Sequence, residues 1–318
     1  MTASVALESL WSDAGVLLSV KIALTLAVAS WYLSQTTTLN NCSTVDRLWS
    51  VLPAVYAWIF AVHAPDGPSA RVVLVCGLIS CWAARLTFNF VRKGGFELHA
   101  EDYRWVHVRS WFAPYPWLLW EAFNVGFIAV YQTFLILSFA LPVWALTQLP
   151  AAPIDLATRL LAAAFATMLY LQTLTDEQQW EFHNAKVYHG LKVPVERQAF
   201  LESLSVSMRK AILEPAVVDD VLKRGFRSCG VFAFSRHLNF AMEQAMWWCV
   251  YAFYVAAYVA ASAEPVVWSD WQLYWPATGA LLLTLLFQGS TIVTESLTVR
   301  KYPRYADYQR RVPKFLLI

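Results

Sequence analysis

Long apolar stretches recur along this chain, and they constrain its fold more than any other feature of the sequence. A helix needs about 20 mostly apolar residues to cross the hydrocarbon core of a bilayer. Such stretches lie at Gly15–Ser34, Trp49–His63, Arg71–Val91, Leu118–Leu146, Leu156–Thr175, Gln244–Ser262 and Trp271–Ser290. The second is short, and the fourth is long enough to tilt or break. The pattern predicts an all-α fold, a polytopic membrane bundle of about seven transmembrane helices.

The composition agrees with a membrane protein that has little soluble surface. Of the 318 residues, 58% are hydrophobic and 14% are charged, whereas about a quarter of the residues are charged in soluble domains. The first apolar stretch lacks a basic segment before it and a small-residue cleavage site after it, so we expect a retained span and not a signal peptide. No repeat or low-complexity linker divides the chain, and we expect residues 1–318 to form a single integral membrane domain.

The basic residues lie mostly between alternate spans. If the N-terminus is outside, the inside segments are 35–48, 92–117, 176–243 and 291–318, and they hold 20 of the 24 Lys and Arg residues. Lys and Arg are enriched in cytoplasmic loops. We therefore predict seven helices with a cytosolic C-terminus. The membrane would be that of the endoplasmic reticulum in a eukaryote, or the inner membrane in a bacterium.

Polar and ionisable side chains gather at the cytosolic end of this predicted bundle. Ionisable residues inside spans usually face the bundle interior, and they are candidates for a functional site. Arg85 lies within the third span and shares a helix face with Asn89, four residues later. Segment 176–243 carries most of the other polar groups, and the tail 291–318 adds tyrosines. The groups at this end include Asp46, Arg92, Glu101, Asp102, Arg104, Asp176, Gln178, Gln179, His183, Asn184, Lys186, Arg236, His237, Asn239, Glu243, Tyr302, Tyr305 and Tyr308.

Together these groups predict a pocket for an anionic, hydrogen-bonding ligand that opens to an apolar cavity. Structural roles remain alternatives for some residues: Asn124 and Gln132 could bond between helices or snorkel, and the three tail tyrosines could form an interfacial aromatic belt. The chain has neither GxGxxG nor GxxxxGK[ST], so the helical bundle itself would have to hold any cofactor. The five cysteines form no CxxC pair, and no metal site is predicted.

A resemblance to a known family begins at Ser235–Trp248, which reads SRHLNFAMEQAMWW. This stretch resembles the SRHPN[YF]xxE signature of the steroid 5-alpha reductase-like integral membrane family, including its large uncharacterised branch. Further stretches resemble that branch in the same order: VDRLWS, WAARLTFNFVRKGG with EDYRW, DEQQWEFHNAK, and TESLTVRKYPRYADYQRRVPKF. The resemblance covers about residues 40–318.

The resemblance implies a cofactor site. In the family, the cytosolic end of a seven-helix bundle holds NADPH, and a lipid-like enone lies deeper in the cavity. Asn239 and Glu243 match the family's cofactor-holding Asn and Glu, Asp176 matches an Asp on the preceding polar helix, and Tyr305 falls in the terminal aromatic motif. The expected cofactor-binding residues are Asp102, Arg104, Asp176, Gln179, Lys186, Arg236, His237, Asn239, Glu243, Tyr302 and Tyr305. The expected catalytic residues are Asp46, Trp82 and Arg85.

The chain departs from the family pattern at several positions. Leu238 replaces the usual Pro, so we expect the bend there to rest on contacts from neighbours such as Phe240 and Arg236. Trp82 stands where steroid reductases have a Tyr, and Ser290 stands where they have an Arg. Their early Gln-Glu pair is missing, and Asp46 is only a loose substitute. The cofactor residues therefore match better than the active-site residues, and a steroid substrate is not implied.

The resemblance implies a reductase of lipid metabolism that acts on CH–CH groups with NADPH. Hydride would pass to the β-carbon of a conjugated enone, and an acid would protonate the α-carbon; a Tyr, Asp46 and a protonated Glu are all candidates for that acid. The expected partners are the lipid bilayer and a small lipophilic substrate, with no nucleic acid and no metal.

Two other functions remain open. Integral-membrane isoprenylcysteine methyltransferases have a similar RHPxY stretch and a polar, aromatic tail that bind S-adenosylmethionine, so a methyltransferase is the main alternative. A non-enzymatic lipid-binding or transport protein would also contain buried polar groups. Transporter sites, however, usually lie near the midplane of the bilayer, and the polar groups here lie at one end.

Overall fold

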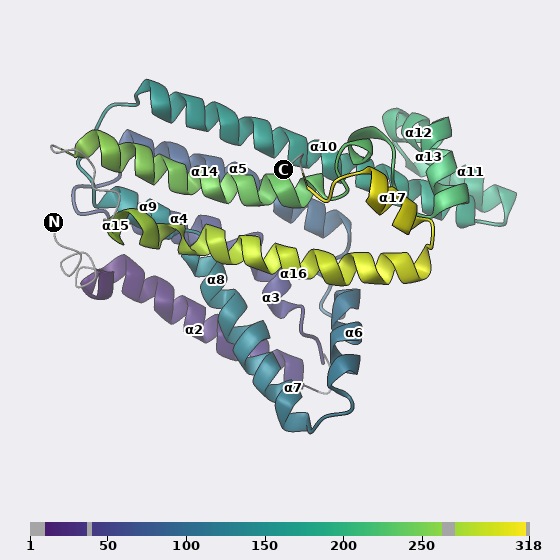
Figure 1. The fold of residues 1–318 in the computed structure, drawn as a ribbon, viewed down its shortest axis with the longest axis horizontal. Helices are drawn as coiled ribbons and strands as arrows, with labels where there is room; N and C mark the ends of the chain where they lie inside the picture. Colours follow the sequence, from purple (N-terminus) through teal and green to yellow (C-terminus); the bar gives the residue numbers. More distant parts are fainter. Residues whose placement is uncertain (1–9, 37–39, 263–270, 316–318) are drawn as a thin grey trace. The chain divides into compact units, whose positions relative to one another are not determined.

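The structure is a computed structural model that describes residues 10–36, 40–262 and 271–315. Within these ranges the regular structure is entirely helical, with no strand, which confirms the all-α prediction (Figure 1). The chain divides into two units. Unit 1 consists of Met1–Ala166 and Met246–Leu285, and unit 2 of Thr167–Ala245 and Leu286–Ile318. The boundaries fall inside three helices, and each unit is described by itself.

Unit 1 contains most of the apolar helices. In chain order they are α2 (Ala14–Gln35), α3 (Thr44–Leu48), α4 (Leu52–Val62), α5 (Ala70–Arg92), α6 (Tyr103–Phe112), α7 (Trp117–Phe123), η1 (Asn124–Tyr131), α8 (Gln132–Ser138), α9 (Leu141–Thr147), α15 (Trp271–Tyr274) and η4 (Trp275–Ala277). Unit 1 also includes the start of α10 (Leu156–Gly190), the second part of α14 (Leu238–Ala261) and the start of α16 (Thr278–Lys301).

Small residues let the helices of unit 1 approach closely. The buried face of α2 carries the small residues Gly15, Ser19, Ala23, Ala27, Ser30 and Ser34 at spacings of three or four. Such a stripe brings helix backbones together in membrane proteins, and α2 packs here against η1 and α8. Helix α4 packs against α5 and α9.

Among the described residues, four helical segments are long and apolar enough to cross a membrane: Ala14–Gln35, Ala70–Arg92, Trp117–Thr147 and Trp271–Lys301. They support a multi-pass membrane protein. The other three predicted spans are also helical, as α4, α10 and α14, but α4 has only 11 residues. The total of seven spans and the side of the C-terminus stay predictions.

The long fourth stretch is irregular, as its length suggested. Between α7 and α8 the helix widens into the π-helix η1, and Pro142 lies in the first turn of α9. Phe123, Phe127 and Tyr131 stack along this stretch, with successive ring centroids 4.9 and 5.3 Å apart. A π-helical insertion shifts the faces of the helix on either side of it.

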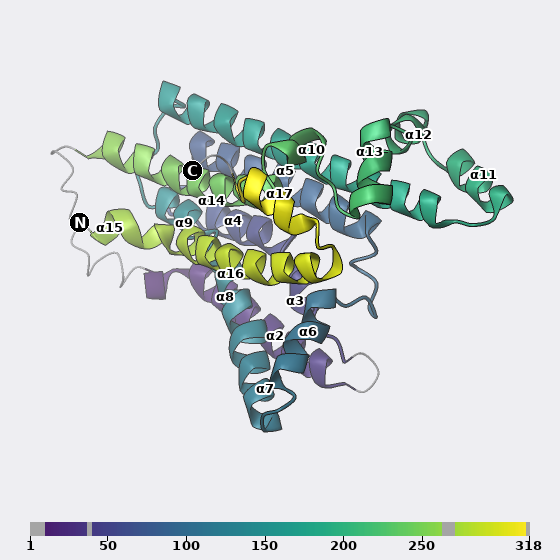
Figure 2. The same cartoon turned by 45° about the vertical axis from the view of Figure 1, so that its right-hand side comes forward.

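Unit 2 contains the remaining short helices and the polar ends of the long ones. Its own helices are α11 (Pro194–Ser203), α12 (Val206–Ile212), α13 (Pro215–Asp219), η2 (Asp220–Arg224), η3 (Gly230–Ala233) and α17 (Tyr305–Arg311). Figure 2 shows α12 and α13 beside the C-terminal part of α10, where Ala185, Ile212 and Val217 form a buried cluster. A second cluster joins Phe226, Tyr305 and Tyr308.

Candidate functional site

A buried carboxylate organises the polar groups of the SRHLN stretch. Glu295 of α16 is 7% exposed and accepts hydrogen bonds from Arg236 Nε at 2.6 Å, His237 Nε2 at 2.9 Å and Gln309 Nε2 at 2.9 Å. The Tyr305 hydroxyl donates a longer bond of 3.3 Å to the same carboxylate. Arg236, His237 and Tyr305, three of the expected cofactor ligands, therefore converge on one protein carboxylate.

The C-terminal tail is bound to the same stretch through the backbone. The amides of Arg236 and His237 each donate a 3.0 Å bond to the tail, to the carbonyls of Pro313 and Lys314. Arg236 Nη1 also donates to the carbonyl of Val312. The sequence predicted that packing of neighbouring side chains would hold the bend before α14. In the structure, these hydrogen bonds to the tail hold it.

A second polar layer lies between α10 and α14 within unit 2. Gln172 Nε2 donates to Glu243 Oε2 at 2.5 Å and to the Asn239 carbonyl at 3.4 Å. Gln172 and Asp176 share a face of α10, and Asn239 and Glu243 share a face of α14, because each pair is four residues apart. Gln172, Asp176 and Glu243 are all at most 8% exposed. The structure thus places Glu243 and the backbone carbonyl of the half-buried Asn239 at one layer, with Asp176 one turn along α10.

Gln172 has an unused acceptor in this layer. Its Oε1 is buried and has no hydrogen-bond partner among the described residues. A buried polar atom without a partner costs about 1–3 kcal/mol, so a ligand or water that donates a hydrogen bond to it would be stabilised.

Arg227 is also buried with unused hydrogen-bonding groups, but these are donors, whereas the unused group of Gln172 is an acceptor. Its side chain is 4% exposed, and Nη2 forms a long ion pair of 3.6 Å with Glu181. The Nε and Nη1 groups are buried and have no partner within the described part of the chain. A buried guanidinium with so little compensation is suited to binding an anionic group.

Lys186 and Gln179 lie farther along α10. Lys186 Nζ donates to the Tyr302 hydroxyl at 2.8 Å and to the Gly225 carbonyl at 3.2 Å. Burial acts to raise the pKa of Tyr302, but Lys186 and Lys301 outweigh it and lower that pKa overall. Gln179 is partly exposed and lies 3.4 Å from His183, measured from Nε2 to Nε2. The Lys186–Tyr302 pair ties α10 to the start of the tail.

Two glycines allow the loop between η2 and η3 to pass close to its neighbours. Gly225 and Gly230 have φ of 84° and 67°, in the left-handed region that favours glycine. A Cβ at Gly225 would lie 2.3 Å from the Tyr302 ring, and one at Gly230 would lie 2.3 Å from Gln178 Oε1. Side chains at either position would push the loop away from α10 and the tail.

Asp102 and Arg104 lie in unit 1, where they pair with each other. Arg104 donates from Nε to Asp102 Oδ1 and from Nη2 to Oδ2, both at 2.8 Å, and the Asp102 carboxylate also caps the first turn of α6. The pair holds the pKa of Asp102 below its usual value despite burial. The other nine expected cofactor residues lie in unit 2.

Asp46 lies beside this pair. The Trp105 indole donates to Asp46 Oδ2 at 3.1 Å. Burial raises the pKa of the Asp46 carboxyl, and the hydrogen bonds from Ser43 and Trp105 oppose this rise only in part. A carboxyl with a raised pKa keeps its proton to higher pH, as a general acid must.

Trp82 and Arg85 take different positions on α5. Trp82 is 1% exposed and meets Trp247 edge to face, with ring centroids 4.9 Å apart. Trp247 in turn stacks on Phe139 at 4.7 Å, so Trp82 is part of an aromatic core. Arg85 is half-buried on the same helix.

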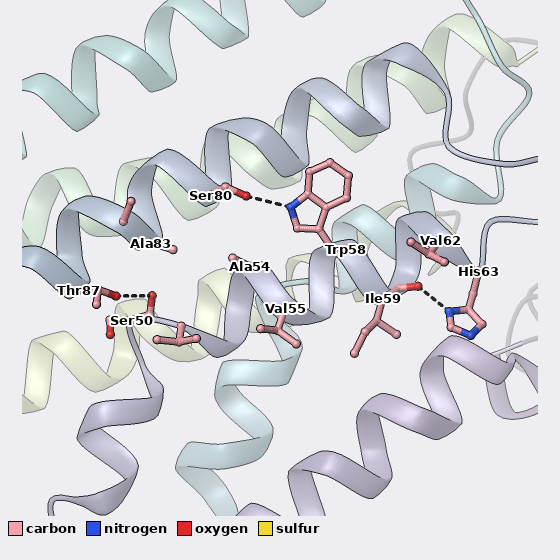
Figure 3. A pocket seen from close by; sticks show the side chains of 12 residues that line it. Ser50, Ala54, Val55, Trp58, Ile59, Val62, His63, Ser80, Ala83 and Thr87 are labelled. Atoms are coloured by element: carbon pink, nitrogen blue, oxygen red, sulfur yellow. Dashed lines mark hydrogen bonds between the residues drawn. The ribbon is translucent and has the colours of Figure 1, made fainter. Parts of the chain in front are cut away.

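An apolar groove of about 640 Å³ opens between α4 and α5 in unit 1. Figure 3 shows Ser50 and Thr87 at one end and His63 at the other, with Trp58 between them donating a 2.9 Å bond to Ser80. Small side chains such as Ala54 and Ala83 leave the space along its length. Ser50, in the groove lining, follows Asp46 by four positions in the chain. An apolar groove of this volume is the size of a small-molecule site.

The chain is similar to a known protein family over most of its length. Residues 30–312 match the family described as "Protein of unknown function (DUF1295)". The chain belongs to the DUF1295 family. A relative in Schizosaccharomyces pombe, "Uncharacterized protein C594.04c", is 32% identical over 279 residues, which cover 87% of this chain and 72% of the relative. No solved structure shows significant similarity to this chain.

The DUF1295 segment includes Glu295, Gln172 and Arg227, three residues that the sequence analysis did not single out. Glu295 could have been identified as a candidate site residue from the sequence, because it is an ionisable residue at the end of an apolar stretch. Gln172 had a weaker signal, four residues before Asp176. Arg227 was one of nine basic residues in segment 176–243, and only burial distinguishes it.

Proposed function

We propose that this DUF1295 chain is a membrane-embedded, NADPH-dependent reductase of a conjugated C=C bond in a lipid-like substrate of the steroid, sterol or isoprenoid type. The observation that carries the proposal is the layer in which Gln172 donates to the buried Glu243 carboxylate and to the backbone carbonyl of Asn239. It contains the two residues that match the cofactor-holding Asn and Glu of the steroid 5-alpha reductase-like family.

The residues of unit 2 fit a dinucleotide. Gln172 has a buried acceptor without a partner, and Arg227 has two buried donors without one. A dinucleotide carries amide and hydroxyl donors and anionic phosphates, which complement such groups. We assign Gln172, Asn239 and Glu243 to the neutral parts of the cofactor and Arg227 to a phosphate. NADPH would supply the hydride.

Asp46 and the groove of unit 1 support the other half of the proposal. The raised pKa of Asp46 suits the proton donor to the α-carbon. The apolar groove suits the hydrocarbon part of the substrate and would keep water from it. The proposal also includes seven spans, a cytosolic C-terminus, and the endoplasmic reticulum or bacterial inner membrane as the location.

Cofactor titration of the purified full-length chain tests the proposal. We expect saturable binding of NADPH by isothermal titration calorimetry, weakened about tenfold or more by Glu243→Ala and by Asn239→Ala. Glu202→Ala, at an exposed position of α11, serves as the matched control and should bind as the wild type does. Binding of S-adenosylmethionine without NADPH would replace the reductase by a methyltransferase. Wild-type affinity for both cofactors in both variants would mean that the site has been misplaced.

A further inference from the structure

A separate basic pocket of about 300 Å³ opens in unit 2, between α17 and the loop after η2. Its lining includes three guanidinium groups, of Arg224, Arg304 and Arg311, and one carboxylate, of Asp307. We propose that this pocket binds a phosphate monoester. The proposal does not depend on the reductase activity, because it rests only on the charges and hydrogen bonds around the pocket.

Two of the three arginines keep an uncompensated charge. Arg224 Nη1 pairs with the buried Asp220 at 2.6 Å, and Asp307 is paired with Arg310. Arg304 donates from Nη1 to the Lys223 carbonyl at 3.1 Å, which leaves its charge uncompensated.

The side chain of Arg311 has no hydrogen bond or ion pair to any described residue. The pocket thus presents a net charge of about +2 from Arg304 and Arg311, which matches a phosphate monoester of charge −1.5 to −2 near pH 7. Guanidinium groups bind phosphate oxygens in bidentate fashion.

The walls of the pocket are held in place before any ligand binds. Asp220 accepts hydrogen bonds from the Ser228 amide at 2.6 Å and its hydroxyl at 2.7 Å, which fixes the loop. The Tyr308 hydroxyl donates to the Phe232 carbonyl, and the Tyr308 ring packs on Phe226 with centroids 5.3 Å apart. A preformed site loses less conformational entropy on binding than a mobile one.

A phosphate monoester could reach this pocket from two sources. One is a soluble nucleotide, such as one with a 2′-phosphate. The other is a lipid with a monoester headgroup, such as phosphatidic acid, because the pocket lies on the tail that follows the apolar helix α16. The chemistry is the same in both cases, and binding measurements can separate the sources.

The test uses the full-length protein in detergent, with inorganic phosphate as the probe in isothermal titration calorimetry. We expect Arg311→Gln and Arg304→Gln each to weaken phosphate binding about tenfold or more. Arg311→Lys keeps the charge but not the bidentate fork, so its loss should be smaller. Arg300→Gln is the control: it removes one positive charge from an exposed position of α16, outside the pocket lining, and should bind phosphate as the wild type does. Equal melting temperatures of all variants would show that the weaker phosphate binding does not come from a loss of folded protein.

Competition then identifies the source of the ligand. Displacement of phosphate by adenosine 2′-monophosphate, but not by adenosine, would identify a soluble nucleotide. Loss of phosphate binding in nanodiscs with phosphatidic acid, but not in those with phosphatidylcholine alone, would identify a lipid headgroup. The proposal is overturned if wild-type protein does not bind phosphate, if Arg300→Gln weakens binding as much as Arg311→Gln does, or if neither ligand competes.

Discussion

Glu295 on α16 accepts a 2.6 Å hydrogen bond from Nε of Arg236, a residue 59 positions earlier in the chain. Both side chains are less than a tenth exposed. The most recognisable polar motif of the sequence is therefore anchored by a carboxylate from the last long helix. Loss of function after mutation of Arg236 or His237 would have a structural explanation as well as a cofactor-binding one, and stability measurements separate the two.

The first prediction concerns Glu295. Replacing it by Ala leaves the Arg236 guanidinium buried without its carboxylate, and breaking a buried ion pair in this way typically costs about 3–5 kcal/mol. We expect a comparable fall in the free energy of unfolding, measured by denaturation with SDS in mixed micelles. Asp307→Ala breaks an exposed pair with Arg310 and should change little. Equal small effects of both variants would mean that the buried pair contributes no more than a surface pair.

The second prediction separates stability from binding at Arg227. Its buried charge is poorly compensated, and an uncompensated buried charge is costly, so Arg227→Met should leave the free energy of unfolding unchanged or raise it. If Arg227 holds a cofactor phosphate, the same variant should bind NADPH about tenfold or more weakly. Calorimetry and SDS denaturation on one preparation measure both effects.

A large destabilisation by Arg227→Met would contradict this reading. It would mean that the 3.6 Å contact with Glu181 supports the fold, and Arg227 would lose its assignment to a phosphate. Arg197→Met, at an exposed position of α11, is a suitable control for the loss of one positive charge.

The helices could be predicted from the sequence wherever apolar length alone determines them. The stretch Gly15–Ser34 became α2, Ala14–Gln35, and Arg71–Val91 became α5, Ala70–Arg92. A helix can continue past its apolar part. The predicted span ends at Thr175, and α10 runs on to Gly190, because the Asp, Glu, Gln and Lys residues that follow remain compatible with a helix outside a membrane.

The sequence predicted which region of the chain forms the polar site, but not which residues there bond to each other. The i, i+4 spacing placed Asn239 and Glu243 on one face of α14, and the structure brings Gln172 to that face. The acceptor for Arg236 could not be found this way, because Glu295 is distant in sequence and no helical spacing relates the two. Asp102 and Arg104 are two positions apart in the chain, and the cap of α6 is enough to bring them into an ion pair.

The third prediction is a pH dependence that arises from Asp46. Its folded-state pKa is raised, so its contribution to stability is fully present below the unfolded pKa of about 3.9 and is lost as pH rises through the folded value. The melting temperature of the wild type should therefore fall over that range relative to Asp46→Asn, which stays neutral and keeps an acceptor for Trp105. Asp307→Asn, at an exposed position, should not change the profile. Parallel profiles for wild type and Asp46→Asn would contradict the raised pKa.

The fourth prediction concerns topology. The distribution of Lys and Arg predicts that the C-terminus and the loop between α4 and α5 lie on opposite sides of the membrane. A reporter fused after Ile318 should be cytosolic, and a glycosylation acceptor inserted within residues 64–69 should be modified in the lumen of microsomes. Readouts from the same side for both positions would contradict seven spans, because five of those spans lie between the two positions and an odd number of crossings puts them on opposite sides.

The last prediction concerns Leu238, which begins α14. The N–H groups of the first turn have no partner within a helix, and proline is favoured at the first helical position. The bend before it is held by the amides of Arg236 and His237, which Leu238→Pro leaves intact. This variant should therefore keep its NADPH affinity and be as stable as the wild type, or more stable by up to about 1 kcal/mol through the unfolded state.

Ala241→Pro is the matched control for Leu238→Pro, because Ala241 N donates a 3.1 Å bond to the His237 carbonyl. Losing that bond and inserting the ring in the helix should cost about 3 kcal/mol. If Leu238→Pro is destabilised as much as Ala241→Pro, then the 6% exposed Leu238 side chain holds the start of α14 by packing. The position of Asn239 would then depend on that packing, and the tail carbonyls would be insufficient to fix the bend.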